Sequence, residues 1–273
     1  MKELSTRAIS GALYISLLIL CIYWQYALIV LFLGFGLICM AEFKKLIQLE
    51  SKAPYIVFIT MYLGFSIWCV FSSKDSGFNE AIQILHVITI FVQLLLIKDL
   101  FSEKTIPLFN TKRFILTTFY LTTSFIFLIL IANNDYDFTP LLLLGAFILA
   151  WVNDTGAYLI GKNFGKQKLF PRISPKKTVE GFLGGLFFAC VASYFIAKFT
   201  GTLDSTYWLI LGIIVSVFGT LGDLIESKFK RQANVKDSGV IMPGHGGLLD
   251  RLDSIIFVAP FFYLFLRLFP HVS

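Results

Sequence analysis

The stretch FILTTFYLTTSFIFLILIA, residues 114–132, is uncharged and long enough to cross the hydrocarbon core of a bilayer as one helix. Similar stretches recur along the chain, which is 57% hydrophobic and only 15% charged, with a mean hydropathy of +0.78. A soluble domain carries about 25% charged residues. Because so few charges cannot cover a surface that faces water, the sequence predicts an all-α, polytopic integral membrane protein.

Outward from this stretch, apolar runs of the length that a membrane span requires continue to both ends of the chain. The first two runs predict a hairpin that breaks near Gln25, and the alternative is one long tilted helix over residues 9–41. We therefore expect about nine transmembrane helices. Their expected ranges are 9–24, 26–41, 54–71, 81–97, 114–132, 140–161, 179–198, 206–225 and 252–269.

The distribution of basic residues predicts the orientation of these helices. With a cytoplasmic N-terminus, all of the 23 Lys and Arg lie on the inner side except Lys74, Lys198 and Arg267. Such an excess of basic residues is typical of cytoplasmic loops. The single-helix alternative would move Lys2 and Arg7 outside and weaken the asymmetry. The net charge of +6 has the same explanation, so we expect no nucleic-acid partner.

The two long loops on the basic side both lie in the second half of the chain, at residues 162–177 and 226–251. The connections on the other side are short and poor in motifs. We therefore expect residues 1–139 to form a helical scaffold that gives access to lipid. Residues 140–273 are expected to carry the catalytic loops.

Two acids interrupt apolar runs in the second half, Asp154 after Asn153 and Asp223 after Gly222. Glu226 follows Asp223 by three residues and therefore shares its face of a helix. A carboxylate near hydrocarbon costs a few kcal/mol and persists only beside a partner, a cavity or a cation. The alternatives are a purely structural polar contact between helices and a shallow acid that simply reaches water.

The stretch ISPKKTVEG, residues 173–181, predicts a helix start with Ser174 as N-cap and Pro175 as the first helical residue. Lys176 and Lys177 would then lie in the first turn, where cations oppose the helix dipole. A bound anion would account for them. The alternative is that the two lysines only mark the cytoplasmic end of a span.

Basic residues, a glycine-rich loop and acids follow one another between Ser227 and Asp253. Asp250 and Asp253 are three residues apart at an expected helix start, where carboxylates are also favourable as simple capping groups. The combination of these groups nevertheless fits a phosphate and a divalent cation better than capping alone. The basic and loop residues concerned are Lys228, Lys230, Arg231, Lys236, Gly244, His245, Gly246, Gly247 and Arg251.

The stretch from Ser227 to Asp253 resembles the signature of phosphatidate cytidylyltransferases, also called CDP-diacylglycerol synthases. Residues 153–158 and 174–181 resemble that family too, so the similarity is close in the C-terminal half and looser elsewhere. One departure is Met242, where the family pattern has Ile or Leu. The resemblance implies that CTP and phosphatidate react to give CDP-diacylglycerol and pyrophosphate.

The resemblance also implies that Asp223 and Asp250 hold Mg²⁺ and act in catalysis. We interpret Lys236 and His245 as further catalytic groups, with His245 positioning phosphate through its loop. Asp154, Glu226 and Asp253 are expected to support the metal or the basic groups. The expected substrate-binding residues are Lys176, Lys177, Arg231, Lys236, Gly244, Gly246, Gly247 and Arg251.

The implied setting is the bacterial cytoplasmic membrane, with the active site facing the cytoplasm and membrane lipid as a partner. The family resemblance also implies a homodimer. Two alternatives are a CTP-using lipid kinase or another nucleotidyltransferase that acts on a polyprenyl or lipid phosphate. A transporter also places acids in helices, but near the midplane and in broken helices. The clustering of charges at one face favours an interfacial enzyme.

Overall fold

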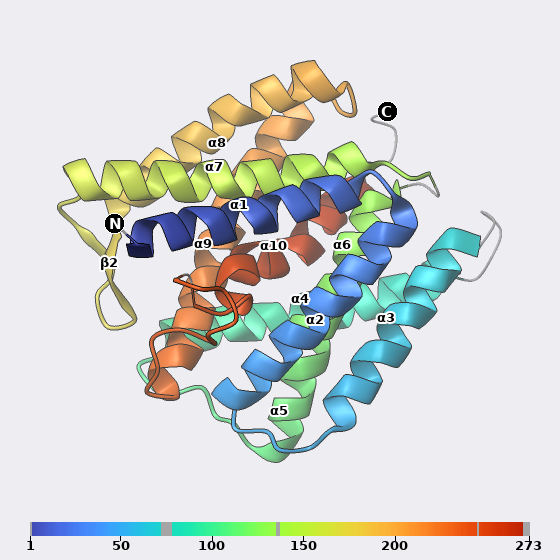
Figure 1. The fold of residues 1–273 in the computed structure, drawn as a ribbon, viewed down its shortest axis with the longest axis horizontal. Helices are drawn as coiled ribbons and strands as arrows, with labels where there is room; N and C mark the ends of the chain where they lie inside the picture. The colour runs from blue at the N-terminus through green and yellow to red at the C-terminus, as the bar shows by residue number, and fades with distance from the viewer. Residues whose placement is uncertain (1, 72–77, 135–136, 245, 270–273) are drawn as a thin grey trace.

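The computed structural model describes residues 2–71, 78–134, 137–244 and 246–269, and helices make up most of this part (Figure 1). Every expected span falls on a helix, although the ends differ by several residues. The segments α5, η1 and α6 follow one another without a break and form one long helix. The helices are α1 (Lys2–Ile22), α2 (Gln25–Leu46), α3 (Ala53–Phe71), α4 (Phe78–Phe101), α5 (Asn110–Leu116), η1 (Thr117–Thr122), α6 (Thr123–Ala132), α7 (Pro140–Phe164), α8 (Val179–Thr200), α9 (Ser205–Gln232) and α10 (Leu249–Leu268).

The all-α membrane class is confirmed. Within the described residues, seven helices are long and apolar enough to cross a membrane, namely α2, α3, α4, the α5–α6 helix, α7, α8 and α9. The apolar part of α1, Ile9–Ile22, is shorter than these. The total of nine spans therefore stays a prediction.

The first two helices form the predicted hairpin and not one long helix. α1 ends at Ile22 and α2 begins at Gln25. Between them Trp24 adopts an extended conformation, with φ −121° and ψ 112°, and precedes α2 as its N-cap residue. Figure 1 shows the chain reversing here, so that α1 lies along α7 while α2 runs down toward α5.

The predicted start of α8 is wrong. Residues Ser174–Thr178 form strand β2, which pairs antiparallel with β1 (Lys168–Phe170), and α8 begins only at Val179. Thr178 is the N-cap, and its hydroxyl accepts a hydrogen bond from the backbone N–H of Gly181 at 3.1 Å. Thr caps a helix much as Ser does, and pairing with β1 satisfies the backbone of the preceding residues. Lys176 and Lys177 therefore lie on a strand and not in a helical turn.

The predicted end of α9 is also wrong, because this helix continues past Ile225 to Gln232. Lys and Arg are good helix formers, so a basic run need not end a helix. The extension places Lys228 and Lys230 in the protein interior, where each is only 8% exposed. The loop that leads to α10 is correspondingly shorter than expected.

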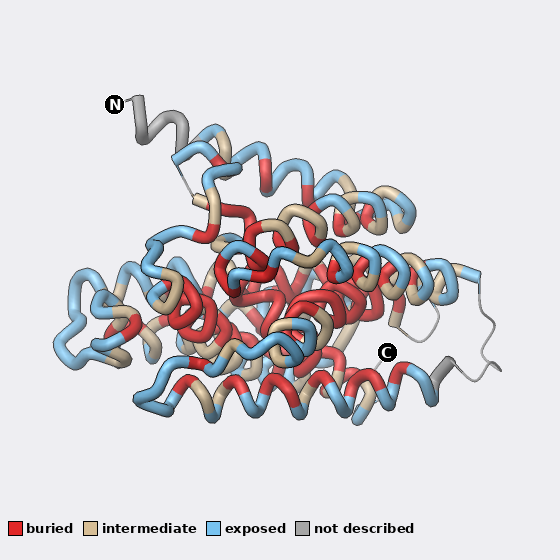
Figure 2. The backbone as a smooth tube through the Cα atoms, turned by 90° about the horizontal axis from the view of Figure 1, so that it is seen from below, coloured by how far each residue is buried: buried red, intermediate tan, exposed pale blue. Residues whose placement is uncertain are grey.

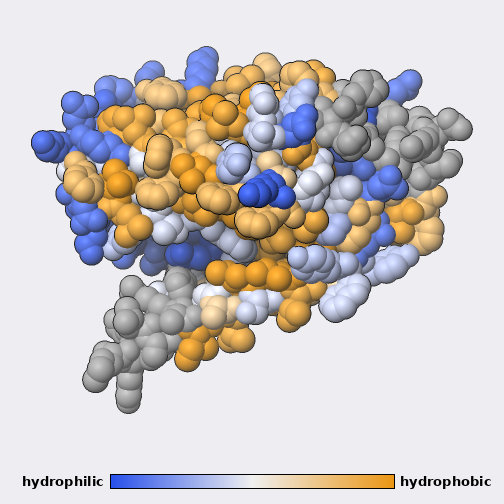
Figure 3. Space-filling view, turned by 90° about the horizontal axis from the view of Figure 1, so that it is seen from above, coloured by the Kyte–Doolittle hydropathy of each residue, from blue (hydrophilic) through white to orange (hydrophobic). Residues whose placement is uncertain are grey.

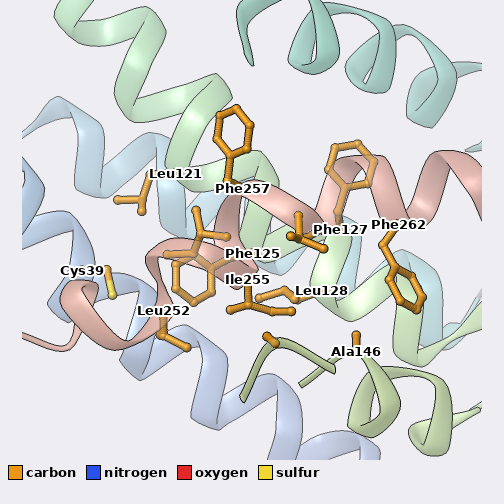
Figure 4. Close-up of a cluster of buried hydrophobic side chains, with 14 of the residues drawn as sticks. Cys39, Leu121, Phe125, Phe127, Leu128, Ala146, Leu252, Ile255, Phe257 and Phe262 are labelled. Atoms are coloured by element: carbon orange, nitrogen blue, oxygen red, sulfur yellow. The ribbon is translucent and has the colours of Figure 1, made fainter. Parts of the chain in front are cut away.

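The apolar core is centred on α10, which is buried along most of its length. Figure 2 shows that the buried backbone gathers at the centre of the molecule. Phe257 and Phe262 of α10 lie near Phe127 and Leu128 of α6 in the close-up of the core (Figure 4). α8 differs, because large apolar side chains such as Phe199, which is 80% exposed, point away from the protein. Figure 3 shows a broad apolar face beside a hydrophilic end, the arrangement expected of a protein whose sides face lipid.

Candidate functional site

An ion pair between α9 and the β-hairpin lies at the centre of the candidate site. The Nζ of Lys177 on β2 lies 2.5 Å from Oδ2 of Asp223 on α9, and Ser227 Oγ donates to Asp223 Oδ1 at 3.2 Å. The two ion-paired side chains keep 27% and 32% of their surface exposed. Because the pair is open to its surroundings, an incoming phosphate can compete with Asp223 for the ammonium group. The strand thus brings Lys177 to the acid, although the local structure differs from the expected one.

A second cation, Lys230, connects two more carboxylates. Its Nζ donates to Asp250 Oδ1 at 2.7 Å, and it also pairs with Glu226, one turn earlier on α9. The side chains of Lys230, Glu226 and Asp250 are 10%, 0% and 6% exposed. Sequence reasoning preferred Arg231 and did not assign Lys230 to the site. The spacing of four residues from Glu226 was the signal that could have identified it.

The glycine-rich loop wraps around Asp250. The backbone N–H groups of Gly247 and Ser238 donate to Asp250 Oδ2 at 2.7 Å and 2.9 Å, and Ser238 Oγ lies 3.0 Å from the same oxygen. Gly244 and Gly246 have φ values of +75° and +90°, which favour glycine. A Cβ at Gly246 would lie 2.8 Å from Asp250 Oδ2. Part of the role of these glycines is therefore to let the loop fold closely around this acid.

Three helices bring further acids to the same region. Asp154 on α7, Asp223 on α9 and Asp253 on α10 are close enough for their charges to interact. Asn153 Nδ2 donates to Asp154 Oδ1 at 3.3 Å. Asp253 is 8% exposed, and its Oδ1 accepts a hydrogen bond from the N–H of Ser254 at 2.6 Å. The result is an acid-rich layer between α7, α9 and α10.

Of the other predicted residues, Arg231 contacts the β-hairpin. Arg231 lines a cavity of about 440 Å³ beside the β-hairpin, where its Nε donates to the carbonyl of Ile173 at 3.3 Å. Lys176, Lys236 and Arg251 are exposed. The prediction for His245 falls outside the described residues.

The carboxylates alone do not form a complete magnesium site, and they fit the ion only if a substrate phosphate supplies further oxygens. Among the described residues, no group of three or more His, Cys, Asp or Glu is arranged to hold a metal. Lysine ammonium groups lie against Asp223 and Asp250, at positions that a metal cation would also favour. Mg²⁺ is commonly bound by one or two carboxylates and substrate phosphates. Asp223 would match that donor set if Lys177 turned from the carboxylate to a substrate phosphate. Asp250, held by Lys230, would be the second carboxylate.

A family model and one relative match almost the whole chain, and further relatives match a shorter part of it. The sequence model of the Cytidylyltransferase family matches residues 5–269. The phosphatidate cytidylyltransferase of Bacillus subtilis (strain 168) is 38% identical over 275 residues, which cover 98% of this chain and 100% of the relative. The enzymes of the same name from Staphylococcus aureus (strain COL) and Staphylococcus haemolyticus (strain JCSC1435) are 54% and 52% identical over 120 residues. Those matches cover 43% of this chain and 46% of each relative.

Proposed function

Since the chain belongs to the cytidylyltransferase family, we propose that it transfers the cytidylyl group of CTP to phosphatidate, which gives CDP-diacylglycerol and pyrophosphate. The match to the Bacillus subtilis phosphatidate cytidylyltransferase extends over the full length of that relative. The observation that carries the proposal is the open ion pair of Lys177 and Asp223, beside the acid-rich layer of an integral membrane protein. A lipid phosphate and a nucleotide can both reach such a site from the membrane surface.

The proposed reaction requires positioning more than proton transfer. An oxygen of the phosphatidate phosphate forms a bond to the α-phosphorus of CTP. The bond between that phosphorus and the oxygen that bridges it to the β-phosphorus breaks. Pyrophosphate leaves with the electron pair. Phosphatidate is already anionic near neutral pH, so no strong base is needed. Catalysis then depends on holding the two anionic substrates in line and neutralising their charge.

We assign these tasks to the side chains that the fold brings together. Lys177 is the residue that binds phosphate when its ammonium group leaves Asp223. Lys230 holds Asp250 and Glu226 in place from the buried side of α9. Asp223 and Asp250 are the proposed Mg²⁺ ligands. A magnesium ion bound there would neutralise the negative charge that develops on the leaving pyrophosphate.

The reaction is tested directly with purified, folded protein. We expect CDP-diacylglycerol to form from CTP and phosphatidate in the presence of Mg²⁺, with little product from ATP, GTP or UTP. Product formation is followed with radiolabelled CTP and lipid extraction. Absence of product with both Mg²⁺ and Mn²⁺ would reject the proposed function. Equal use of all four nucleotides would reject its specificity for CTP.

We further propose that the site faces the cytoplasm, that the N-terminus is cytoplasmic and that the protein is a homodimer. The orientation follows from the basic loops. Two single cysteines test the orientation in a background without the four native cysteines. Val240→Cys lies in the loop before α10 and Asp204→Cys lies between α8 and α9, so the proposed orientation places them on opposite sides of the membrane. Val240 is 90% exposed and Asp204 is also exposed, so a reagent can reach both. An impermeant thiol reagent added to intact cells should label position 204 and not position 240. Labelling of position 240 and not of position 204 would show that the orientation is opposite to the proposed one.

A further inference from the structure

Glu42, near the C-terminal end of α2, is a buried carboxylate in the half of the chain expected to serve as scaffold. Only 2% of its surface is exposed. An ionised carboxylate is stable in such a place only when hydrogen-bond donors replace the water it has lost. The groups that surround Glu42 therefore indicate what it does.

In the part of the chain that the structure describes, Glu42 has three hydrogen-bond donors, and all three come from the signature segment of the C-terminal half. Its Oε1 accepts from the N–H of Leu248 at 3.2 Å, and its Oε2 accepts from the N–H of Leu249 at 2.8 Å. Its Oε2 also lies 3.3 Å from Ser238 Oγ. Leu248 is the N-cap residue of α10 and offers no side-chain cap. Glu42 thus caps α10 from a different helix, with its charge at the positive end of the helix dipole.

Two glycines of the signature segment are shaped to fit this carboxylate. A Cβ at Gly239 would lie 2.2 Å from Oε1 of Glu42. A Cβ at Gly247 would lie 2.6 Å from Oε2 of Glu42 and 2.1 Å from Ser238 Oγ. Real Cβ atoms do not approach other atoms so closely. A larger residue at either position would therefore require the Glu42 carboxylate or the loop to move.

The segments that Glu42 holds are the same segments that hold Asp250. Ser238 donates its N–H to Asp250 and shares its single hydroxyl hydrogen between Asp250 and Glu42, at distances of 3.0 Å and 3.3 Å. Gly247, whose N–H also donates to Asp250, directly precedes the two residues that donate to Glu42. We propose that Glu42 is a positioning residue, which fixes the loop around Asp250 and thereby the geometry of the active site. This proposal rests on the proposed function for its effect on catalysis.

Glu42→Gln tests the proposal, because glutamine keeps the size of the side chain and removes its charge. The amide nitrogen cannot accept hydrogen bonds, so one donor loses its acceptor, either a backbone N–H of Leu248 or Leu249 or the hydroxyl of Ser238. We expect kcat to fall at least about tenfold, while KM for CTP and for phosphatidate changes less than about threefold. Glu50→Gln, the same substitution at an exposed position just after α2, should stay within about twofold of wild type. Wild-type kcat in folded Glu42→Gln would overturn the proposal.

A double-mutant cycle with Ser238→Ala separates positioning from general stabilisation. Because Glu42 and Ser238 contact each other and hold the same loop, the double variant should lose much less activity than the product of the two single losses. Independent, multiplying losses would contradict the proposal. If Glu42→Gln does not fold, Glu42→Asp replaces it in the same comparison, since it keeps the charge but withdraws it from Leu249. Wild-type kcat in that variant would equally overturn the proposal.

Amide hydrogen exchange gives a readout that does not depend on the reaction. In Glu42→Gln, exchange in the peptide over residues 238–250 should accelerate at least about tenfold, while exchange in α8 stays as in wild type. If this occurs but the wild-type protein makes no CDP-diacylglycerol, Glu42 positions the loop and the proposed function fails. If the wild-type protein is active and exchange in the peptide does not change, the positioning role fails alone.

Discussion

Replacement of Asp223 by Asn is expected to lower kcat at least about 10²–10³-fold and to leave the melting temperature in detergent almost unchanged. Asn keeps the size of the side chain but loses the charge that the proposed metal requires. Lys177 then lacks its partner, but its side chain is 27% exposed, so its ammonium group can be solvated. Exposed ion pairs contribute little to stability. The measurement is kcat against Mg²⁺ concentration, beside a melting curve.

Asp204→Asn is the matched control for this experiment. Asp204 precedes α9 at the end opposite to Asp223, and its side chain makes no capping hydrogen bond. The same chemical change there should leave kcat within about twofold of wild type. An Asp223→Asn protein that stays within a few-fold of wild type at low Mg²⁺ would show that Asp223 is not a metal ligand.

Replacement of Asp250 by Asn is expected to lower kcat by a similar factor and, unlike the first substitution, to lower the melting temperature by several degrees. The Asp250 carboxylate accepts from Lys230, from the N–H of Gly247 and from Ser238. Asn offers only one acceptor oxygen, so a buried donor is left unsatisfied, at a cost of about 1–3 kcal/mol. Of the two ionic partners that the described residues give to the buried Lys230, Glu226 alone remains. The difference in melting temperature between the two Asn variants is therefore the quantity to measure.

Asp237→Asn provides the stability control, because Asp237 lies in the same loop and its side chain is exposed. Its melting temperature should match that of the wild-type protein. If Asp250→Asn melts with the control and not below it, the hydrogen bonds around Asp250 do not hold the loop in solution. If its kcat also stays within a few-fold of wild type, the catalytic role of Asp250 fails.

The sequence alone determined the features that depend on local pattern. Apolar length predicted the helices, and the polar break near Gln25 predicted the hairpin of α1 and α2. Acids inside apolar runs indicated that Asp154 and Asp223 need a partner, a cavity or a cation, and Asp223 does pair with Lys177. Buried polar groups in general find a hydrogen-bond partner, and Nε2 of the buried His86 accordingly lies 2.8 Å from the carbonyl oxygen of Pro260.

Only the tertiary structure decided which segments meet. Lys177 reaches Asp223 because β1 pairs with β2, and the motif around Ser174 carries no local sign of that pairing. Glu42 was not selected from the sequence, because it follows directly after an apolar run that was expected to end at Ala41. Its partner Ser238 lies 196 residues away. Helix periodicity and capping act over a few residues, whereas the satisfaction of a buried charge depends on donors from any part of the chain that packing brings near.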